Sequence, residues 1–150
     1  LDRSSAASDV YKRQVLLGDD EAGVIAALHG SLFGIRAGLI ANTVDAMQQL
    51  DADPHRMHAL LGPSATGRNM RVSEAVAADM ENRVPHTRSK TPQGQPSVDL
   101  RRGIAYQLVQ AGLAGVTIDP RCTIEDPAFF STYREGKTGC QAGVIWRSND

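Results

Sequence analysis

Short apolar runs alternate with segments of helical periodicity along most of the chain. Val15–Leu17 and Gly23–Leu28 are two such runs, joined by a turn-like Gly-Asp-Asp-Glu sequence, and they predict a β-hairpin or two sequential strands. His58–Leu61 and Val116–Ile118 predict two further short strands. Because strands and helices alternate with uneven connections, the sequence predicts an α+β fold of layered helices and sheets, without a regular Rossmann order.

Three segments place apolar residues three or four positions apart, which is the spacing of one helix face. Ile35–Leu50 predicts a helix of about four turns. Ser73 and Asp99 are the expected N-caps of a second and a third helix, because their side-chain oxygens can accept from the first free N–H groups. The residues expected to face inward from these two helices are Val76, Met80 and Val84, and Leu100, Ile104 and Leu108.

Two other segments have opposite character. Pro85–Ser97 is polar and holds three prolines. We expect it to form neither helix nor strand, and to project as an exposed loop or a lid. Ala142–Trp146 is an uncharged, mainly apolar run and predicts a last, buried strand.

The first fourteen residues, Leu1–Gln14, look foreign to the rest of the chain. They are polar, show neither helical nor strand period, and stop abruptly at an apolar run. They resemble translated adaptor or assembly artefacts, and a natural disordered terminus is the alternative. We therefore expect a foreign tail over residues 1–14 that makes no packing contacts, and a partial domain over residues 15–150 that begins within a strand.

The overall composition argues against several classes of protein. The formal net charge is −1, so no general attraction to nucleic acid or to an anionic membrane is expected. No apolar run approaches the ~18 residues of a transmembrane helix, and the N-terminus lacks the apolar stretch of a signal peptide. Two cysteines are too few for a disulfide scaffold, so a reduced, cytoplasmic protein is the simplest interpretation.

Two loops of small residues follow predicted strands and carry candidate binding residues. His29 opens the first loop and is either a metal ligand or general base, or a packed turn histidine. The second loop, Leu61–Arg68, could bind an anion such as phosphate through Arg68, and an ordinary tight connection is the alternative. Because both loops follow strands and precede helices, we expect them to open on the same edge of the sheet, with His29 in a pocket beside Gly62–Pro63.

Other polar residues carry weaker signals. Arg134–Gly139 is charged and turn-rich, and forms either a solvated turn or a cationic loop over a site. His55 and His58 should point to different faces, so we do not expect them to share a metal ion. Cys122 and Cys140 have no Cys-x-x-Cys partner, which argues against a zinc ribbon or a redox pair.

Taken in order, these motifs resemble the laccase-domain family. Its members were first described as multicopper polyphenol oxidases and are now regarded as purine nucleoside phosphorylases; bacterial members are also called peptidoglycan editing factors. The resemblance runs from about Val15 to Trp146 and is greatest to actinobacterial members. The segments that carry it are His29–Gly34 followed by Ala37–Ile40, Gly62–Pro63, Met70–Val72, Asp99–Leu100, Cys122–Thr123, Phe129–Ser131, and Arg134 with Gly136, Thr138–Gly139 and Gln141–Ala142.

The resemblance implies an α-β-β-α layered fold that here lacks its N-terminal part. It implies phosphorolysis of purine nucleosides such as adenosine and inosine, with adenosine deamination as a side activity, so the implied partners are a nucleoside and phosphate. It also implies one metal ion, zinc or in older descriptions copper, held by two histidines and a cysteine. His29 corresponds to the second histidine, and Arg68 and Arg134 are the residues chosen for anion binding. The sequence sets no oligomeric state.

Several family positions differ in this chain. The other two metal ligands have no counterpart, and the first fourteen residues stand where the cysteine-bearing segment is expected. Leu32 and Phe33 replace a Trp and an Arg of the family's turn, while Tyr133 and Cys140 stand at arginine positions. We therefore expect weak zinc binding and little phosphorolysis from this chain alone. A non-catalytic member that binds a nucleotide or a partner protein is the competing interpretation.

Overall fold

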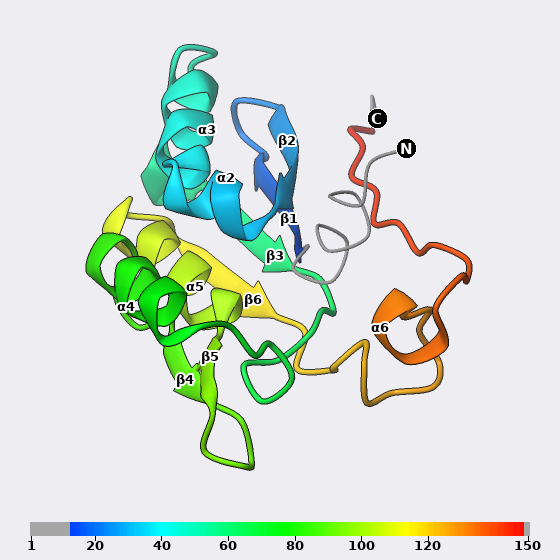
Figure 1. Ribbon diagram of the computed structural model, residues 1–150. Coiled ribbons are helices and arrows are strands. Elements are labelled where there is room, and N and C mark those ends of the chain that lie inside the picture. Colours follow the sequence, from blue (N-terminus) through cyan, green and yellow to red (C-terminus); the bar gives the residue numbers. More distant parts are fainter. Residues whose placement is uncertain (1–12, 149–150) are drawn as a thin grey trace, which may run out of the picture.

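A four-stranded mixed sheet covered by helices on one face forms the body of the molecule (Figure 1). The computed structural model describes residues 13–148. The elements in chain order are β1 (Arg13–Asp19), β2 (Val24–Gly30), α2 (Leu32–Arg36), α3 (Leu39–Gln48), η1 (Pro54–Arg56), β3 (His58–Leu61), α4 (Glu74–Arg83), β4 (Arg88–Lys90), β5 (Pro96–Val98), α5 (Leu100–Gln110), β6 (Gly115–Ile118) and α6 (Thr132–Glu135). The predicted α+β class, the opening hairpin and the strands at β3 and β6 are confirmed.

The strand order β2-β1-β3-β6 decides which strand ends, and the loops that follow them, lie at the same edge of the sheet. β1 pairs antiparallel with both β2 and β3, and β6 runs parallel to β3. β2, β3 and β6 therefore point the same way, and their carboxyl ends share one edge with the start of β1. Figure 1 shows α2, α3 and α5 on one side of this sheet, with α6 and the C-terminal segment on the other side.

Alternation along β1 and β3 separates a buried face from an outer face. Val15, Leu17, Ala59 and Leu61 are almost fully buried, whereas Leu60 on the outer face is half-exposed. The inward residues pack against apolar side chains of the helix layer, namely Ile35, Ile40, Val44, Met47, Ile104 and Leu108. Burial of this apolar area is the main stabilising term of the fold, because successive strand residues point to opposite faces and only one face meets helices.

The caps predicted for the second and third helices are confirmed. The side chain of Ser73 accepts a hydrogen bond from the N–H of Val76 at the start of α4, and Asp99 accepts from Arg101 at the start of α5. Each cap satisfies one N–H group that has no partner within the helix. The inner face of α4 differs from the prediction, since Ala77 is buried while Val76 is 37% exposed. Val76 and Ala77 both lie at helical spacing from Met80, so the sequence pattern could not show which of the two faces inward.

The single helix predicted over Ile35–Leu50 is wrong. The structure breaks it at Gly38, whose φ of 92° lies in the left-handed region, and forms α2 and α3 instead. That conformation interrupts the helical hydrogen-bond ladder and turns the chain, while Ile35 and Ile40 on either side both stay buried. Leu50 lies beyond α3 and is exposed.

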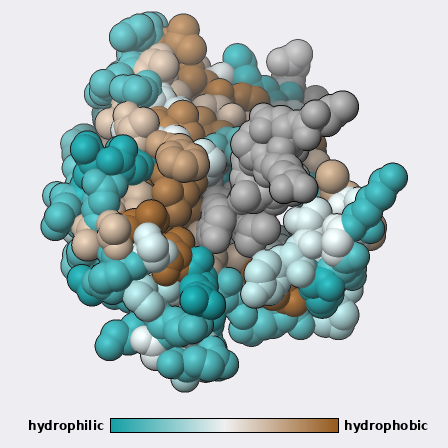
Figure 2. Space-filling view, in the orientation of Figure 1, coloured by the Kyte–Doolittle hydropathy of each residue, from teal (hydrophilic) through white to brown (hydrophobic). Residues whose placement is uncertain are grey.

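The prediction that Pro85–Ser97 forms neither helix nor strand is also wrong. β4 and β5 pair antiparallel through Arg88–Val98, Ser89–Ser97 and Lys90–Pro96. Gly94, with a φ of 78°, allows the tight connection between them, and a proline is tolerated because the hairpin is short and Pro96 begins its strand. Figure 2 shows mainly hydrophilic residues on the loop of this hairpin, at the bottom of the view, so the loop does project as expected.

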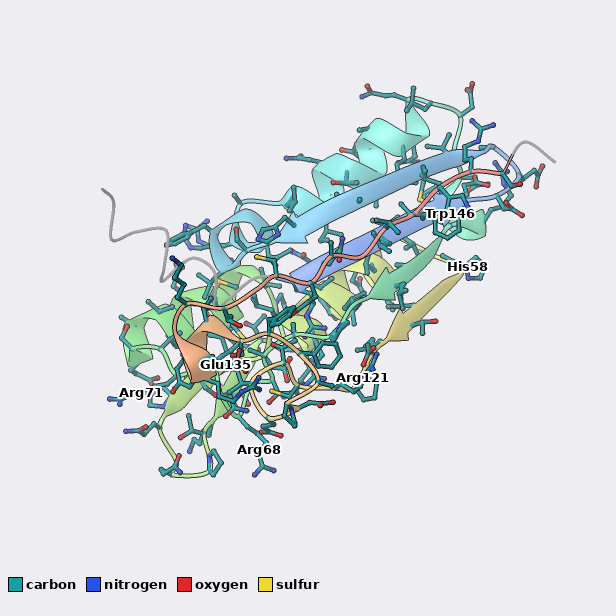
Figure 3. The ribbon with its side chains drawn as sticks, turned by 90° about the vertical axis from the view of Figure 1, so that its right-hand side faces the viewer. His58, Arg68, Arg71, Arg121, Glu135 and Trp146 are labelled. Atoms are coloured by element: carbon teal, nitrogen blue, oxygen red, sulfur yellow. The ribbon has the colours of Figure 1, made fainter. Side chains whose placement is uncertain are left out.

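The buried last strand predicted over Ala142–Trp146 is not formed. Within residues 13–148 this segment pairs with no strand, and Val144 and Trp146 are 70% and 73% exposed. It runs across the outer face of the sheet, where it lines a second cavity together with β1, β2 and β3 (Figure 3). A strand needs a neighbouring ladder to pair with, and a segment that crosses the face of a sheet meets side chains instead.

The predicted foreign tail lies mostly outside the described residues. Only Arg13 and Gln14 of residues 1–14 fall within them, and both belong to β1. For these two residues the expectation of no packing contacts does not hold, because Arg13 is 1% exposed and pairs with Gly30 of β2. Within residues 13–148 no helix is long and apolar enough to cross a membrane.

Candidate functional site

A cavity of about 710 Å³ opens at the sheet edge where the carboxyl ends of β2, β3 and β6 meet. His29 reaches it from β2, Gly62 and Pro63 follow β3, and Asp119 follows β6. His29 alternates with inward-facing neighbours in β2, which places its side chain on the outer face of the sheet. The expected meeting of His29 with the Gly62–Pro63 loop is confirmed, and the cavity has the size of sites that take small organic ligands.

The outer wall of this cavity is a lobe formed by residues 122–136, which ends in the short helix α6. Arg134 lies at its centre and donates from Nη1 to the carbonyl oxygens of Thr123, Ile124 and Asp126 at 3.3, 3.0 and 3.1 Å. From Nη2 it donates to the carbonyl oxygen of Phe129 at 2.6 Å and to the carboxylate of Glu135 at 2.6 Å. These contacts tie an irregular loop to a helix of only four residues.

Two glutamine side chains fasten the segment that follows the lobe. The amide of Gln141 donates to the carbonyl oxygen of Phe130 and accepts from its N–H, both at 3.0 Å. Gln14 of β1 makes the same reciprocal pair with the backbone of Gly143. Each side-chain amide makes the two hydrogen bonds that a peptide group of a paired strand would make. Residues 139–143 are therefore held beside the cavity without forming a sheet.

Asp119 supplies a carboxylate to the cavity, and most of its hydrogen-bonding capacity is already used. Arg121 donates to it from Nε at 2.9 Å, from Nη2 at 2.5 Å and from its backbone N–H at 3.0 Å. These bonds lower the pKa of Asp119 to about 2, so the group is ionised at neutral pH. The guanidinium of Arg121 also lies 4.9 Å from the ring centre of Phe129.

Cys122 lies beneath the lobe and is almost fully buried. Burial alone would raise the pKa of its thiol, but N–H groups of Thr66 and Glu125 point at the sulfur and bring the pKa below its ordinary value. The side-chain amide of Asn69 approaches Sγ at 3.5 Å and also donates to the carboxylate of Glu125 at 2.6 Å. The thiol therefore helps to dock the loop after β3 onto the lobe.

Arg13 is buried under the same sheet edge. Its Nη1 donates to the carbonyl oxygen of Gly62 at 3.0 Å, while Nε and Nη2 have no hydrogen-bond partner among the residues that the structure describes. Burial, and then the positive charge of Arg101, lower the pKa of Arg13 to about 9. A guanidinium with two unpaired donors in the interior destabilises the folded state.

Of the three predicted site residues, only His29 lines the cavity. His29 lines the cavity, whereas Arg68 projects from the opposite end of the loop at the lower edge of the view (Figure 3) and does not line it. Arg134 stands behind the wall with its guanidinium engaged as described above. The cavity brings Cys140 and Asp119 to the same space as His29. Even so, within residues 13–148 no three His, Cys, Asp or Glu side chains are placed to hold one metal ion together.

Sequence reasoning missed Asp119, Gln141 and the aromatic residues of the lobe. Asp119 comes directly after the strand predicted at Val116–Ile118, so the rule that selected His29 would have selected it too. Gln141 and Phe130 follow no predicted strand. They lie in segments that carry the family resemblance, but their pairing joins positions 11 residues apart in irregular backbone and has no local sequence signal.

The chain matches the model of the family described as multi-copper polyphenol oxidoreductase laccase over residues 13–148. It belongs to this family. The relatives include a protein of Corynebacterium glutamicum named purine nucleoside phosphorylase, 47% identical over 132 residues, which are 88% of this chain and 54% of the relative. A protein of the same name from Mycobacterium tuberculosis is 41% identical, over 88% of this chain and 53% of the relative.

Solved structures agree with this assignment. The Neisseria meningitidis protein NMB0706, from the same structural family, superposes with a TM-score of 0.74 at 27% identity, covering 85% of this chain and 53% of the other. YlmD from Geobacillus stearothermophilus gives a TM-score of 0.76 at 24% identity, which supports the fold alone. The chain therefore spans about half the length of the relatives and structures it resembles.

Proposed function

We propose that this chain carries the nucleoside-binding cavity of a purine nucleoside phosphorylase. In the proposed reaction an oxygen of inorganic phosphate bonds to C1′ of the ribose while the bond from C1′ to N9 of the purine breaks. The base leaves with the electron pair and takes up a proton, so the products are ribose 1-phosphate and a free purine. Adenosine deamination, in which water replaces the exocyclic amine as ammonia leaves, is the proposed side activity.

The cavity beside His29 is the observation that carries the proposal. Its volume of about 710 Å³ suits a nucleoside, and its lining combines aromatic rings with polar groups such as Ser64 and Gln141. The relatives that share up to 47% identity over nearly the whole chain are named for this activity. A cytoplasmic location is part of the proposal, since the sequence gives no sign of a disulfide framework.

The metal ion that the family description suggests does not fit the described residues. His29 supplies one imidazole, and no further pair of ligands is placed around it within residues 13–148. A stable zinc site normally needs three or four protein ligands, so we assign no reaction step to a metal in this chain. His29 is proposed as one ligand of a zinc site that these residues do not complete.

Anion binding by Arg68 and Arg134 also stays a prediction. No arginine or lysine lies among the residues that line the cavity within the described part of the chain. The phosphate-binding groups of the proposed reaction are therefore the least defined part of the site. The same shortage supports the competing proposal, in which the chain binds a purine nucleoside without turning it over.

A chimaera separates the two proposals. Residues 13–148 replace the corresponding half of the Corynebacterium glutamicum relative, and release of hypoxanthine from inosine is measured with and without phosphate. The phosphorylase proposal predicts phosphate-dependent release by the chimaera and its loss in His29→Ala. His58→Ala is the matched control, because that histidine lines the second cavity. A folded chimaera that binds inosine but releases no base would contradict phosphorolysis and favour the binding role.

A further inference from the structure

Two aromatic side chains of the lobe are exposed on the wall of the cavity. Phe130 is 51% exposed and Tyr133 is 63% exposed, and both line the cavity together with His29. Their neighbour Phe129 differs from them, because the guanidinium of Arg121 already covers its ring. Apolar side chains that gather on the wall of a cavity are typical of a surface that meets a ligand or a partner.

The position of these rings depends on Arg134. Four hydrogen bonds from its guanidinium gather carbonyl oxygens of the loop that precedes Phe130, and a fifth goes to the carboxylate of Glu135. The side chain of Arg134 is only 28% exposed, and the helix that carries Tyr133 has four residues, too few to be stable alone. Without the guanidinium, several carbonyl groups would lose their partners and the loop would lose its shape.

Phe130 is also fixed from the side of the following segment. Its backbone is bonded in both directions by Gln141, and the end of its ring packs against Gly139. A Cβ atom added at Gly139 would lie 2.9 Å from two atoms of the ring, so a side chain there would displace it. The backbone of Phe130 is therefore anchored, and the end of its ring already has a packing contact, before any ligand arrives.

We propose that Phe130 and Tyr133 stack on the purine base, and that Arg134 is the positioning residue that holds them in place. This inference rests on the proposed function and names the part of the ligand that the lobe recognises. A purine presents two flat π-faces, and aromatic side chains bind such faces without needing a particular edge pattern. An anchored residue such as Phe130 loses less conformational freedom when the base binds.

The same geometry argues against direct binding of phosphate by Arg134. Nη1 and Nη2 are committed to four carbonyl oxygens and a carboxylate, so that, of the guanidinium nitrogens, only Nε makes no hydrogen bond to the described part of the chain. Arginine binds phosphate best with two parallel N–H groups on one edge, and that fork is already in use.

The first test measures inosine binding to the chain by equilibrium dialysis. Phe130→Leu and Tyr133→Leu should each weaken binding on the order of tenfold, because leucine keeps apolar bulk but has no π-face. Phe33→Leu is the control, since Phe33 is 78% exposed and does not line the cavity. Unchanged affinity in both lobe variants, or no binding of inosine by the parent chain, would overturn the inference.

The second test separates positioning from anion binding at Arg134. Arg134→Lys and Arg134→Met should weaken inosine binding to a similar extent, because an ammonium group cannot bond the same set of carbonyl oxygens. Neither variant should change the ratio of affinities measured with and without phosphate. Hydrogen exchange should rise in residues 122–136 and stay unchanged in β1. Retention of the phosphate effect by Lys but not by Met would show that Arg134 acts on the anion.

Failure of this inference is distinguishable from failure of the proposed function. If the chimaera shows full phosphate-dependent turnover with Phe130→Leu in place, the stacking assignment is wrong and the phosphorylase proposal stands. If inosine binding depends on the two rings and the chimaera has no turnover, the stacking assignment stands and the phosphorylase proposal is wrong.

Discussion

Replacement of Arg13 by leucine should stabilise this protein. Arg13 is 1% exposed, and within residues 13–148 its guanidinium bonds only the carbonyl oxygen of Gly62 and leaves Nε and Nη2 without partners. Burial lowers the pKa of Arg13 from its ordinary value to about 9, which corresponds to roughly 5 kcal/mol against the charged form in the folded state at neutral pH. Loss of the bond to Gly62 costs about 1 kcal/mol, so a net gain of a few kcal/mol is expected for Arg13→Leu.

Urea denaturation at pH 7 measures this gain, with Arg102→Leu as the control because Arg102 is exposed on α5. The effect should also depend on pH. The folded pKa of Arg13 is depressed, so above about pH 9 the unfolded chain binds more protons than the folded protein, and the parent protein gains stability as the pH rises from there. The advantage of the leucine variant should therefore be full below pH 8 and shrink above pH 9. Equal or lower stability of Arg13→Leu at pH 7 would contradict this reasoning, because it would mean that Nε and Nη2 are hydrogen-bonded or hydrated in the folded protein.

Three further predictions concern stability and metal binding. Gly103→Ala should destabilise the protein by about 1–3 kcal/mol in urea denaturation, because the new Cβ would collide with buried Thr87. Asp19→Asn should lower the melting temperature at pH 7. The N–H of Asp53 in particular lowers the pKa of Asp19 to about 2, so the contribution of Asp19 should fade as the pH falls from about 4 through 2, and calorimetry over that range would check it. The chain should contain well under one zinc ion per molecule by elemental analysis, and His29→Ala should not lower that content measurably; stoichiometric zinc that His29→Ala removes would mean that the site is complete.

Period and capping signals predicted most of the regular elements. The apolar run at Val15–Leu17 lies within β1, and the caps at Ser73 and Asp99 start α4 and α5, because these signals act within a few neighbouring residues. The break at Gly38 was missed because a glycine within a helical pattern can be either an interior residue or a left-handed stop. Ala142–Trp146 was misassigned because an apolar run does not reveal whether a partner strand is present.

The candidate site also has a part that the sequence could predict and a part that it could not. His29 and the Gly62–Pro63 loop could be paired in advance, since strand direction alone places the ends of β2 and β3 at one edge. The structural role of Arg134 could not be predicted, because its bonds to Thr123, Ile124 and Phe129 depend on the path of an irregular loop. A charged residue in a turn-rich segment gives the same sequence signal whether it binds a ligand or its own backbone.

The position of inosine bound to this chain tests the central claim most directly. A crystal structure of the complex should show the nucleoside in the cavity beside His29, with its base against Phe130 and Tyr133. Binding in the second cavity, beside Trp146 and His58, would contradict the account, as would a nucleoside whose base makes no contact with either ring.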